Sequence, residues 1–302
     1  MRIGLMSGAT ERGGTIDALI ARAKDLESRG FQSLWMANIF GLDAITALAI
    51  VGRETERIEL GTAVVPTFPR HPVAIAQQSL TAQAACRGRF VLGIGLSHQL
   101  VIEDILGLSY DKPARHMREY MAVLEPLLAG KSAKVGGDQY NVNATLDVHG
   151  ASTVPVLIAA LGDHMLNIAG RSSDGTILWM TGPNTIESHI APKLNAAATA
   201  AGRAQPRIVA GLPIVLTNDP DGAREKIAKS MGIYGKLPSY RAMLDKEGAA
   251  GPADIAIAGD EKVLDAALDR LRDVGVTDLD ASIYSVDEGA DERTLAYLES
   301  KL

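Results

Sequence analysis

The run Phe90-Val91-Leu92-Gly93-Ile94-Gly95 contains only apolar residues and glycine, and it is followed directly by Leu96, Ser97 and His98. A strand with one face in water alternates apolar and polar residues. An unbroken apolar run is instead typical of a strand that is covered on both faces, as in an all-parallel sheet. We therefore expect a buried parallel strand at residues 90–95, with the polar residues at its carboxyl end.

Seven further segments have the same apolar character and are predicted as strands. They are Arg2–Met6, Ser33–Ala37, Ile58–Val64, Pro155–Ala160, Thr176–Met180, Arg207–Leu216 and Thr277–Tyr284. Amphipathic segments between and after them predict helices at Thr15–Arg29, Asp43–Thr55, Pro72–Ala85, Pro113–Leu128, His164–Arg171, Thr185–Ala201, Lys262–Val274 and Glu292–Leu302. Eight strands that alternate with helices predict an α/β fold, a (β/α)8 TIM barrel. An open doubly wound sheet would give the same local patterns, but no glycine-rich dinucleotide motif follows the first strand, and the barrel is favoured.

Two segments interrupt the repeat. Residues 131–153 contain Gly136-Gly137 between alternating polar and apolar residues, which predicts a hairpin inserted before the fifth strand. Residues 218–252 form a longer helical insertion after the seventh strand and carry Tyr234 and Tyr240. The second insertion is either a lid or an oligomer contact, and we favour a lid. Residues 1–302 are otherwise expected to form one domain.

Composition excludes several classes of protein. The chain has 302 residues, of which 47% are hydrophobic, and a formal net charge of −6. This acidic balance gives no electrostatic footprint for nucleic acid or for an anionic membrane. Cys86 is the only cysteine, so there is no disulfide framework, and we expect it to be a small core residue. The chain shows neither a secretory signal nor a membrane-spanning apolar segment, and a cytoplasmic protein is expected.

The carboxyl ends of parallel barrel strands meet at one mouth, where TIM-barrel enzymes hold their active sites. The predicted ends are mainly apolar and rich in backbone amides. They show no pair of carboxylates for glycoside hydrolysis and no G-x-S-x-G nucleophile motif. The six histidines have no H-x-H or H-E-x-x-H spacing, so we expect no metal site. A mouth poor in acid–base groups suits a cofactor that carries the difficult chemistry itself.

Two motifs at the predicted mouth allow two interpretations each. Gly93 and Gly95 permit either a tight turn of the backbone or the close approach of a planar ligand, and the segment alone favours neither. Ala160-Leu161-Gly162-Asp163 joins a strand to a helix, whose first amides form a ready anion site for a cofactor phosphate. Asp163 itself is expected to cap this helix, a role that is compatible with phosphate binding by neighbouring amides.

The sequence resembles the bacterial luciferase-like superfamily. The resemblance is carried by Gly61-Thr-Ala-Val-Val-Pro-Thr-Phe-Pro-Arg-His-Pro72, Ala76-Gln-Gln78, Gly88-Arg-Phe-Val-Leu-Gly-Ile-Gly95 and Val154-Pro-Val-Leu-Ile-Ala-Ala-Leu-Gly162, with Ala169-Gly170 and Asp174-Gly175 following. These blocks lie in the family's order and span nearly the whole chain. The chain looks most similar to the actinobacterial branch that uses the deazaflavin coenzyme F420.

The resemblance implies a homodimeric barrel enzyme that holds a tricyclic ring at its mouth, beside a cis peptide bond at Ala63–Val64. The residues expected to contact the cofactor come from the family resemblance and from the ends of the fifth and sixth strands. They are Ala63, Val64, Gly95, Leu96, Ser97, His98, Ala160, Leu161, Gly162, Asp163, Met180 and Thr181. Several relatives place an acidic residue and a histidine after the second strand, where this chain has Asn38 and Ile39. Asn38 and His98 are therefore the candidate catalytic residues, although His98 could instead be a hydrogen-bonding rim residue.

These observations lead to one hypothesis and two alternatives. We expect an oxidoreductase that transfers a hydride between F420 and a small, apolar organic substrate such as a carbonyl compound or an enone. Ile39, Phe40, Trp179, Tyr234 and Tyr240 are expected to line the substrate cavity. The first alternative is an FMN-dependent monooxygenase served by a separate reductase, and the second is a cofactor-binding protein without turnover.

Overall fold

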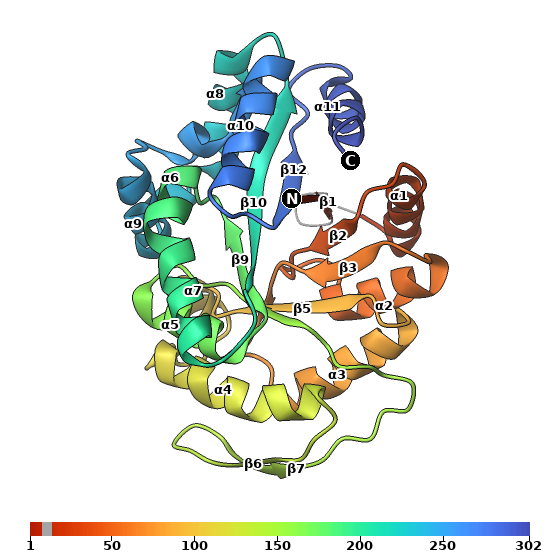
Figure 1. Cartoon of the computed structure of the whole chain (residues 1–302), viewed down its shortest axis with the longest axis vertical. Coiled ribbons are helices and arrows are strands. Elements are labelled where there is room, and N and C mark those ends of the chain that lie inside the picture. The colour runs from red at the N-terminus through yellow and green to blue at the C-terminus, as the bar shows by residue number, and fades with distance from the viewer. Residues whose placement is uncertain (8–13) are drawn as a thin grey trace.

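The computed structural model describes residues 1–7 and 14–302, and in it eight parallel strands close into a barrel (Figure 1). The ring contains β1 (Arg2–Ser7), β2 (Ser33–Met36), β3 (Glu59–Thr62), β5 (Phe90–Gly95), β8 (Val156–Ile158), β9 (Gly175–Trp179), β10 (Arg207–Leu216) and β12 (Asp278–Ile283). Each strand pairs in parallel with the next, and β12 pairs with β1, which closes the ring. The predicted (β/α)8 barrel is confirmed, and the open sheet is excluded.

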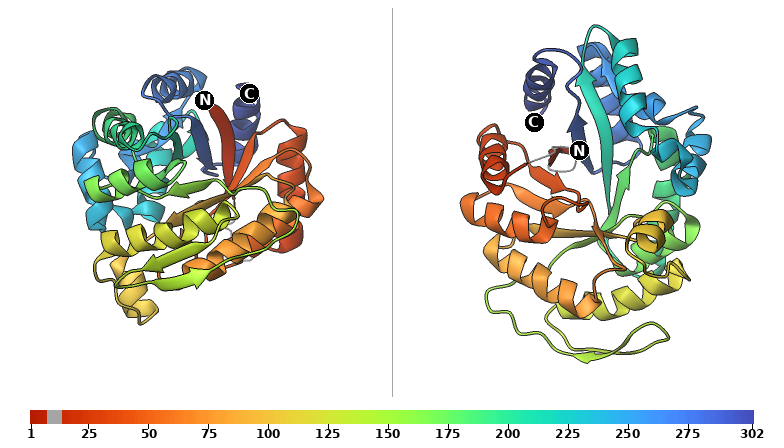
Figure 2. Two further views of the ribbon diagram at one scale, coloured as in Figure 1. Left: turned by 60° about the horizontal axis from the view of Figure 1, so that its bottom comes forward. Right: turned by 180° about the vertical axis from the view of Figure 1, so that it is seen from behind.

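Helices cover the outside of the barrel. The main ones are α1 (Ile16–Ser28), α2 (Ala44–Glu54), α3 (Pro72–Ala85), α4 (Pro113–Leu128), α5 (Asp163–Ser172), α7 (Ala191–Ala200), α10 (Glu261–Asp273) and α11 (Ala290–Glu299). Several begin at side-chain caps that the sequence supplies: Thr15 accepts a hydrogen bond from the Ala18 amide, and Asp43 accepts one from the Thr46 amide. The last helix packs beside the first (Figure 2), where Arg29 donates to Glu292 and Glu299.

The lower part of the barrel interior is filled by large side chains. Trp35, Val91, Leu157, Ile177 and Val209 form this cluster, and none of them is more than 5% exposed. The Trp35 ring requires glycine on the neighbouring strand, because a Cβ at Gly61 would lie 2.1 Å from the ring. The barrel is therefore a packed core at this level and not a pore.

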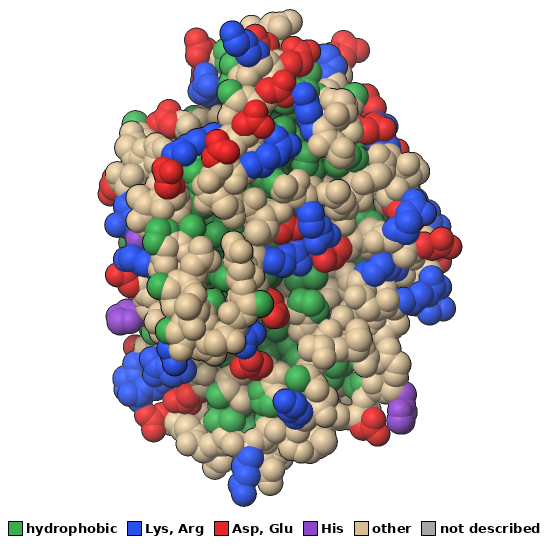
Figure 3. Space-filling view, viewed as in Figure 1, with side chains coloured by type: hydrophobic (Ala, Val, Ile, Leu, Met, Phe, Trp, Pro, Cys, Tyr) green, Lys and Arg blue, Asp and Glu red, His purple; other side chains and the backbone are tan. Residues whose placement is uncertain are grey.

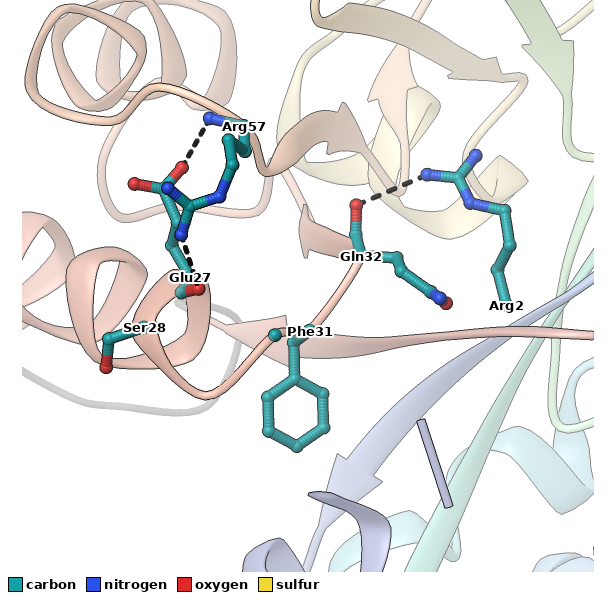
Figure 4. A pocket seen from close by; sticks show the side chains of 7 residues that line it. Arg2, Glu27, Ser28, Phe31, Gln32 and Arg57 are labelled. Carbon is teal, nitrogen blue, oxygen red and sulfur yellow. Dashed lines mark hydrogen bonds between the residues drawn. The ribbon is translucent and has the colours of Figure 1, made fainter. Parts of the chain in front are cut away.

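Charged side chains close the amino-terminal end of the barrel. Arg207 contacts Glu59 at 2.9 Å and Asp278 at 2.6 Å, and its guanidinium lies over the Trp35 ring. Beside this end lies a hollow lined by Arg2, Glu27, Ser28, Gly30, Phe31, Gln32 and Arg57 (Figure 4). Its polar groups are engaged in local contacts, such as that of Glu27 with the Arg57 amide, so its role is structural. The face in Figure 3 mixes charges of both signs without a large patch of one sign.

Both predicted insertions are present. The first contains an antiparallel hairpin, β6 (Ala133–Gly136) and β7 (Asn141–Ala144), which lies against α4 (Figure 1). The second contains α8 (Pro220–Met231), η3 (Tyr234–Lys236), α9 (Pro238–Glu247) and η4 (Pro252–Ile255). It ends in β11 (Ile257–Gly259), a short strand that the sequence pattern did not predict and that pairs in parallel with β10.

Three local departures from the predicted elements lie at the carboxyl ends of strands. The third strand is shorter than predicted: it ends at Thr62, the Ala63–Val64 peptide bond is cis, and β4 (Val65–Pro66) then pairs with β5. A π-helical turn, η1 (Val101–Ile105), follows β5. The predicted helix at 185–201 is divided into α6 (Pro183–Thr185), a π-helical turn η2 (Ile186–Ile190) and α7.

Candidate functional site

The upper end of the barrel interior is less buried than its packed lower part. Met6, Ala63 and Val64 contact the buried lumen cluster, yet each keeps partial solvent exposure, as does Ala159 at the end of β8. All four lie at the carboxyl ends of their strands. The mouth therefore has a floor of small and flexible apolar side chains at the end where barrel enzymes hold their ligands.

A single threonine joins β3 to β5 at this floor. The Thr62 hydroxyl donates to the Gly93 carbonyl at 2.7 Å and accepts from the Gly93 amide at 2.8 Å. The backbone pairing of β3 with β5 is recorded only at Leu60–Phe90 and Gly61–Val91. The buried Thr62 side chain thus replaces the next rung of the ladder, just before the cis bond at Ala63–Val64 that the resemblance implied.

The structure decides between the two interpretations of Gly93 and Gly95 in favour of packing. A Cβ at Gly93 would lie 1.9 Å from the backbone oxygen of Thr62. A Cβ at Gly95 would lie 2.7 Å from Cγ2 of Val64. Both glycines are required by the bulge at Ala63–Val64, which crosses close to β5. They shape the floor of the mouth and need no ligand to explain them.

The loop after β5 holds His98 at the mouth. Ser97 has a φ of 61°, a left-handed conformation that non-glycine residues rarely adopt and that clusters at functional sites. The His98 carbonyl accepts from the amides of Val101 and Ile102, which fixes the loop to η1. The imidazole is partly buried, and this burial lowers its pKa below the ordinary value. The ring is therefore neutral at pH 7.

Aromatic side chains from three segments gather beside His98. Its ring lies 5.9 Å from that of Tyr240, Tyr240 lies 5.0 Å from Tyr234, and Tyr234 lies 6.2 Å from Trp179 (centroid distances). Tyr240 and Tyr234 belong to the second insertion, and Trp179 ends β9. The structure thus brings together four predicted site residues as one wall. Next to Trp179, Met180 has a φ of 51°, and Thr181 donates to the Trp179 carbonyl.

The β8–α5 junction corrects one prediction. Gly162 is the N-cap of α5, no side chain caps the helix, and Asp163 is its first residue. Asp163 instead accepts from Lys193 at 2.5 Å, so the first amides of α5 receive no side-chain cap. His189 contacts the Leu161 carbonyl at 2.8 Å and holds this loop, while Ala160 is buried. The predicted phosphate contacts at Ala160, Leu161 and Gly162 stay a prediction.

The predicted site residues after β2 do not join the aromatic wall. The Asn38 side-chain oxygen accepts from the Ala44 amide at 2.9 Å, and it also receives Arg70 at 3.5 Å. Arg70 pairs with Asp43 at 2.6 Å. The Asn38 carbonyl is therefore engaged in holding its own loop. Ile39 and Phe40 are 53% and 68% exposed and make no aromatic pair with the wall in the described residues.

A second aromatic cluster supports the bulge from outside the barrel. Phe68 stacks on His116 with ring centroids 3.9 Å apart, and Nε2 of His116 contacts the Thr67 hydroxyl at 2.9 Å. The Thr67 amide in turn donates to the Gly95 carbonyl. Burial lowers the pKa of His116 to about 4. This histidine, which is not among the predicted site residues, is a neutral structural residue that links α4 to the mouth.

Asp280 is a buried residue near the mouth that the sequence motifs do not predict as part of the site. It lies on β12, is 0% exposed, and neither carboxylate oxygen has a hydrogen-bond partner within residues 1–7 and 14–302. A usable signal was present in Thr277-Asp-Leu-Asp-Ala-Ser-Ile-Tyr284, where polar residues alternate along a predicted strand. In a parallel barrel such alternation places the polar set inside the lumen.

The described residues contain no group of three or more His, Cys, Asp or Glu side chains placed to hold a metal ion. Within the same part of the chain, no helix has both the length and the apolarity that a bilayer crossing requires. A barrel whose mouth is lined by aromatic rings, small side chains and a neutral histidine belongs to the class of TIM barrels whose mouth suits an organic cofactor.

Comparison with known proteins supplies the family. Residues 1–276 match the luciferase-like monooxygenase family, and the chain belongs to it. A 5,10-methylenetetrahydromethanopterin reductase of Methanolobus tindarius is 27% identical over 212 residues, which are 70% of this chain and 64% of that protein. The match therefore spans less than two thirds of the relative's length.

Two solved structures share the fold. The coenzyme F420-dependent tetrahydromethanopterin reductase of Methanopyrus kandleri has a TM-score of 0.81 at 20% identity, with 100% of this chain and 98% of that chain covered. The oxygenating component of 3,6-diketocamphane monooxygenase of Pseudomonas putida, in complex with FMN, has a TM-score of 0.77 at 14% identity, with 99% and 96% covered. At these identities the likeness is one of fold.

Proposed function

We propose that this protein transfers a hydride between coenzyme F420 and a small apolar organic substrate. The observation that carries the proposal is the mouth itself, which combines partly exposed small side chains, an aromatic wall and one neutral histidine. The F420 dependence of the Methanopyrus kandleri reductase, which shares this fold, supports F420 as the cofactor. Homodimerisation and a lid function for residues 218–252 stay predictions.

The residues of the mouth fit a flat tricyclic ring. Ala63, Val64 and Ala159 are small, face the upper lumen and remain accessible to solvent. Leu96, Ser97 and His98 would hold one edge, and Met180 and Thr181 lie at the end of β9 on the aromatic wall. The uncapped first turn of α5, at Gly162, would hold an anionic tail. A bound deazaflavin supplies the site with a hydride donor or acceptor.

The protein's own part in the chemistry is orientation, exclusion of water and movement of one proton. The aromatic wall of Trp179, Tyr234 and Tyr240 gives an apolar substrate a dry surface. His98 is neutral at pH 7, so its ring accepts the hydroxyl proton of an alcohol during oxidation and returns it to the oxygen during reduction. Burial, and no charged group among the described residues, accounts for the lowered pKa of the His98 ring.

The first test of this proposal is a binding titration of the purified protein with F420, FMN and NADPH, followed by fluorescence quenching. We expect F420 to bind more tightly than FMN, and NADPH not to bind. Turnover is then measured with reduced F420 and a panel of ketones, enones and secondary alcohols. The proposal fails if F420 neither binds nor exchanges a hydride with any member of the panel.

A matched pair of variants tests the role of His98. His98→Ala should lower the hydride-transfer rate by about 100-fold, the ordinary contribution of a positioned acid–base group, with little change in the Kd of F420. His149→Ala is the control, because its side chain is 94% exposed. An unchanged rate in His98→Ala would make His98 a rim residue without a part in proton transfer.

An FMN-dependent monooxygenase is the second candidate. It is favoured by the family description and by the FMN-bound neighbour of the same fold. Oxygen uptake with reduced FMN, together with no hydride transfer from reduced F420, would establish it. Tight binding of either cofactor without any turnover would instead support a cofactor-binding protein.

A further inference from the structure

Asp280 lies inside the barrel, as the alternation along β12 requires. Leu279 and Ala281 belong to the outer core between the strands and the helices. Asp278 lies on the side of the strand opposite to Leu279. It pairs with Arg207, whose guanidinium lies over the lumen residue Trp35. Successive side chains of a strand point to opposite faces, so Asp280 faces the lumen like Asp278.

The two strand neighbours of Asp280 are glycines. The register pairs Asp280 with Gly4 on β1 and with Gly211 on β10. A Cβ at Gly211 would lie 2.9 Å from the Trp179 ring, so the indole occupies the space beside Asp280 on that side. A Cβ at Gly4 would lie 2.0 Å from Oγ of Ser33, which occupies the other side. The carboxyl thus lies at the foot of the aromatic wall.

Toward the mouth, only two lumen-facing groups follow Asp280 on its own strand and on β1. These are Ser282, which is 9% exposed, and Met6, which is partly exposed. The flexible thioether side chain of Met6 changes rotamer at low cost. On these two strands, one flexible side chain and one hydroxyl group therefore lie between the buried Asp280 and the mouth.

The nearby charges do not satisfy Asp280. Arg207 is engaged by Glu59 and Asp278 at the amino-terminal end, and Arg2 contacts the same two carboxylates. Burial without a counter-charge raises the pKa of Asp280 well above its ordinary value and favours the protonated, neutral form of this carboxyl group. It presents one O–H donor and one carbonyl acceptor, and no described residue pairs with either.

An unpaired buried polar group costs stability, and such groups in native proteins are few. We propose that Asp280 is a ligand-binding residue whose protonated carboxyl donates a hydrogen bond to a carbonyl oxygen of the molecule held in the mouth. The inference deepens the proposed function and rests on it for the nature of the ligand. The carbonyl belongs either to the pyrimidine edge of the cofactor ring or to a ketone or enone substrate, and the two sources are separable.

The test compares wild type with Asp280→Asn and Asp280→Leu. Removal of an unpaired acid should leave the melting temperature of the ligand-free protein unchanged or higher in both variants. Asp280→Leu should weaken binding about tenfold, the worth of one hydrogen bond, and Asp280→Asn, which keeps a donor, about threefold or less. A higher Kd for F420 or FMN assigns the carbonyl to the cofactor. An unchanged cofactor Kd with a higher KM for cyclohexenone assigns it to the substrate.

Infrared difference spectra give a readout that does not depend on turnover. The carboxylic C=O stretch, present in wild type and absent from Asp280→Asn, should shift when FMN, F420 or cyclohexenone is added. A shift without hydride transfer would support the Asp280 assignment and refute the proposed function. Hydride transfer without a shift of the C=O stretch, and with unchanged Kd and KM in Asp280→Leu, would support the proposed function and refute the Asp280 assignment. A large loss of melting temperature in both variants, or no shift with any of the three probes, would overturn the assignment.

Discussion

Replacement of Thr62 by valine removes the rung between β3 and β5 while keeping the shape of the side chain. In the wild type the Thr62 hydroxyl donates to the Gly93 carbonyl at 2.7 Å and accepts from the Gly93 amide at 2.8 Å. Thr62 is 0% exposed. In Thr62→Val the Gly93 amide and carbonyl both lose their partner in a site without water access. Each loss costs about 1–3 kcal/mol, so we expect a fall of about 3 kcal/mol in the free energy of unfolding.

The assay is urea unfolding of wild type, Thr62→Val and the control Thr176→Val. Thr176 is also 0% exposed, but its hydroxyl makes one hydrogen bond, to the Ile158 carbonyl at 2.8 Å. We expect the control to lose about 1 kcal/mol. Thr62→Val should also weaken F420 binding, because the floor at Ala63 and Val64 is no longer tied to β5. Equal losses in the two variants would show that the Thr62 bridge has no special role and would refute this reasoning.

Three further predictions concern stability. Gly93→Ala should yield insoluble protein, because its Cβ would meet the Thr62 carbonyl oxygen at 1.9 Å; a soluble, folded variant would contradict the structure at this point. The buried His116 stays neutral down to a pKa of about 4, whereas in the unfolded chain it protonates near 6.5. Stability should therefore fall as the pH drops from 6.5 to 4, by about 3 kcal/mol from this residue, and His116→Gln should show a shallower loss in urea titrations over that range. Cys86 is buried with its pKa raised to about 11, so a thiol reagent should label it only in urea; rapid labelling of the native protein would argue against its burial.

The sequence pattern predicted the strands and helices well, because most barrel strands are covered on both faces and have an apolar sequence; β12, with Asp278, Asp280 and Ser282, is the exception. It also predicted the hairpin at residues 131–153 and the helical insertion after the seventh strand. It failed where the backbone departs from a regular element. The third strand is divided at Ala63–Val64 because a bulge there packs against Gly93 and Gly95. The pattern of apolar residues along the chain cannot predict such a contact between strands.

The local sequence predicts the candidate site only in part for the same reason. His98, Trp179, Tyr234 and Tyr240, all predicted site residues, lie together because the strand ends and the insertion share one face of the barrel, and their roles stay predictions. Asp163 was predicted to cap α5, but Lys193, 30 residues away, binds its carboxylate instead. A capping pattern describes only the neighbouring residues of the chain, and a lysine from another helix is outside its reach.

The order of apolar runs and amphipathic helices was enough to predict a parallel α/β fold of eight strands, because most of these strands are buried on both faces. Only the pairing of β12 with β1 showed that the sheet closes. The local sequence does not show which residues of neighbouring strands lie side by side. The pairing of Asp280 with Gly4 and Gly211, and the indole of Trp179 beside it, exist only once the ring has closed. When the barrel closes, side chains from distant strands exclude water from Asp280. This desolvation disfavours the charged carboxylate and raises its pKa.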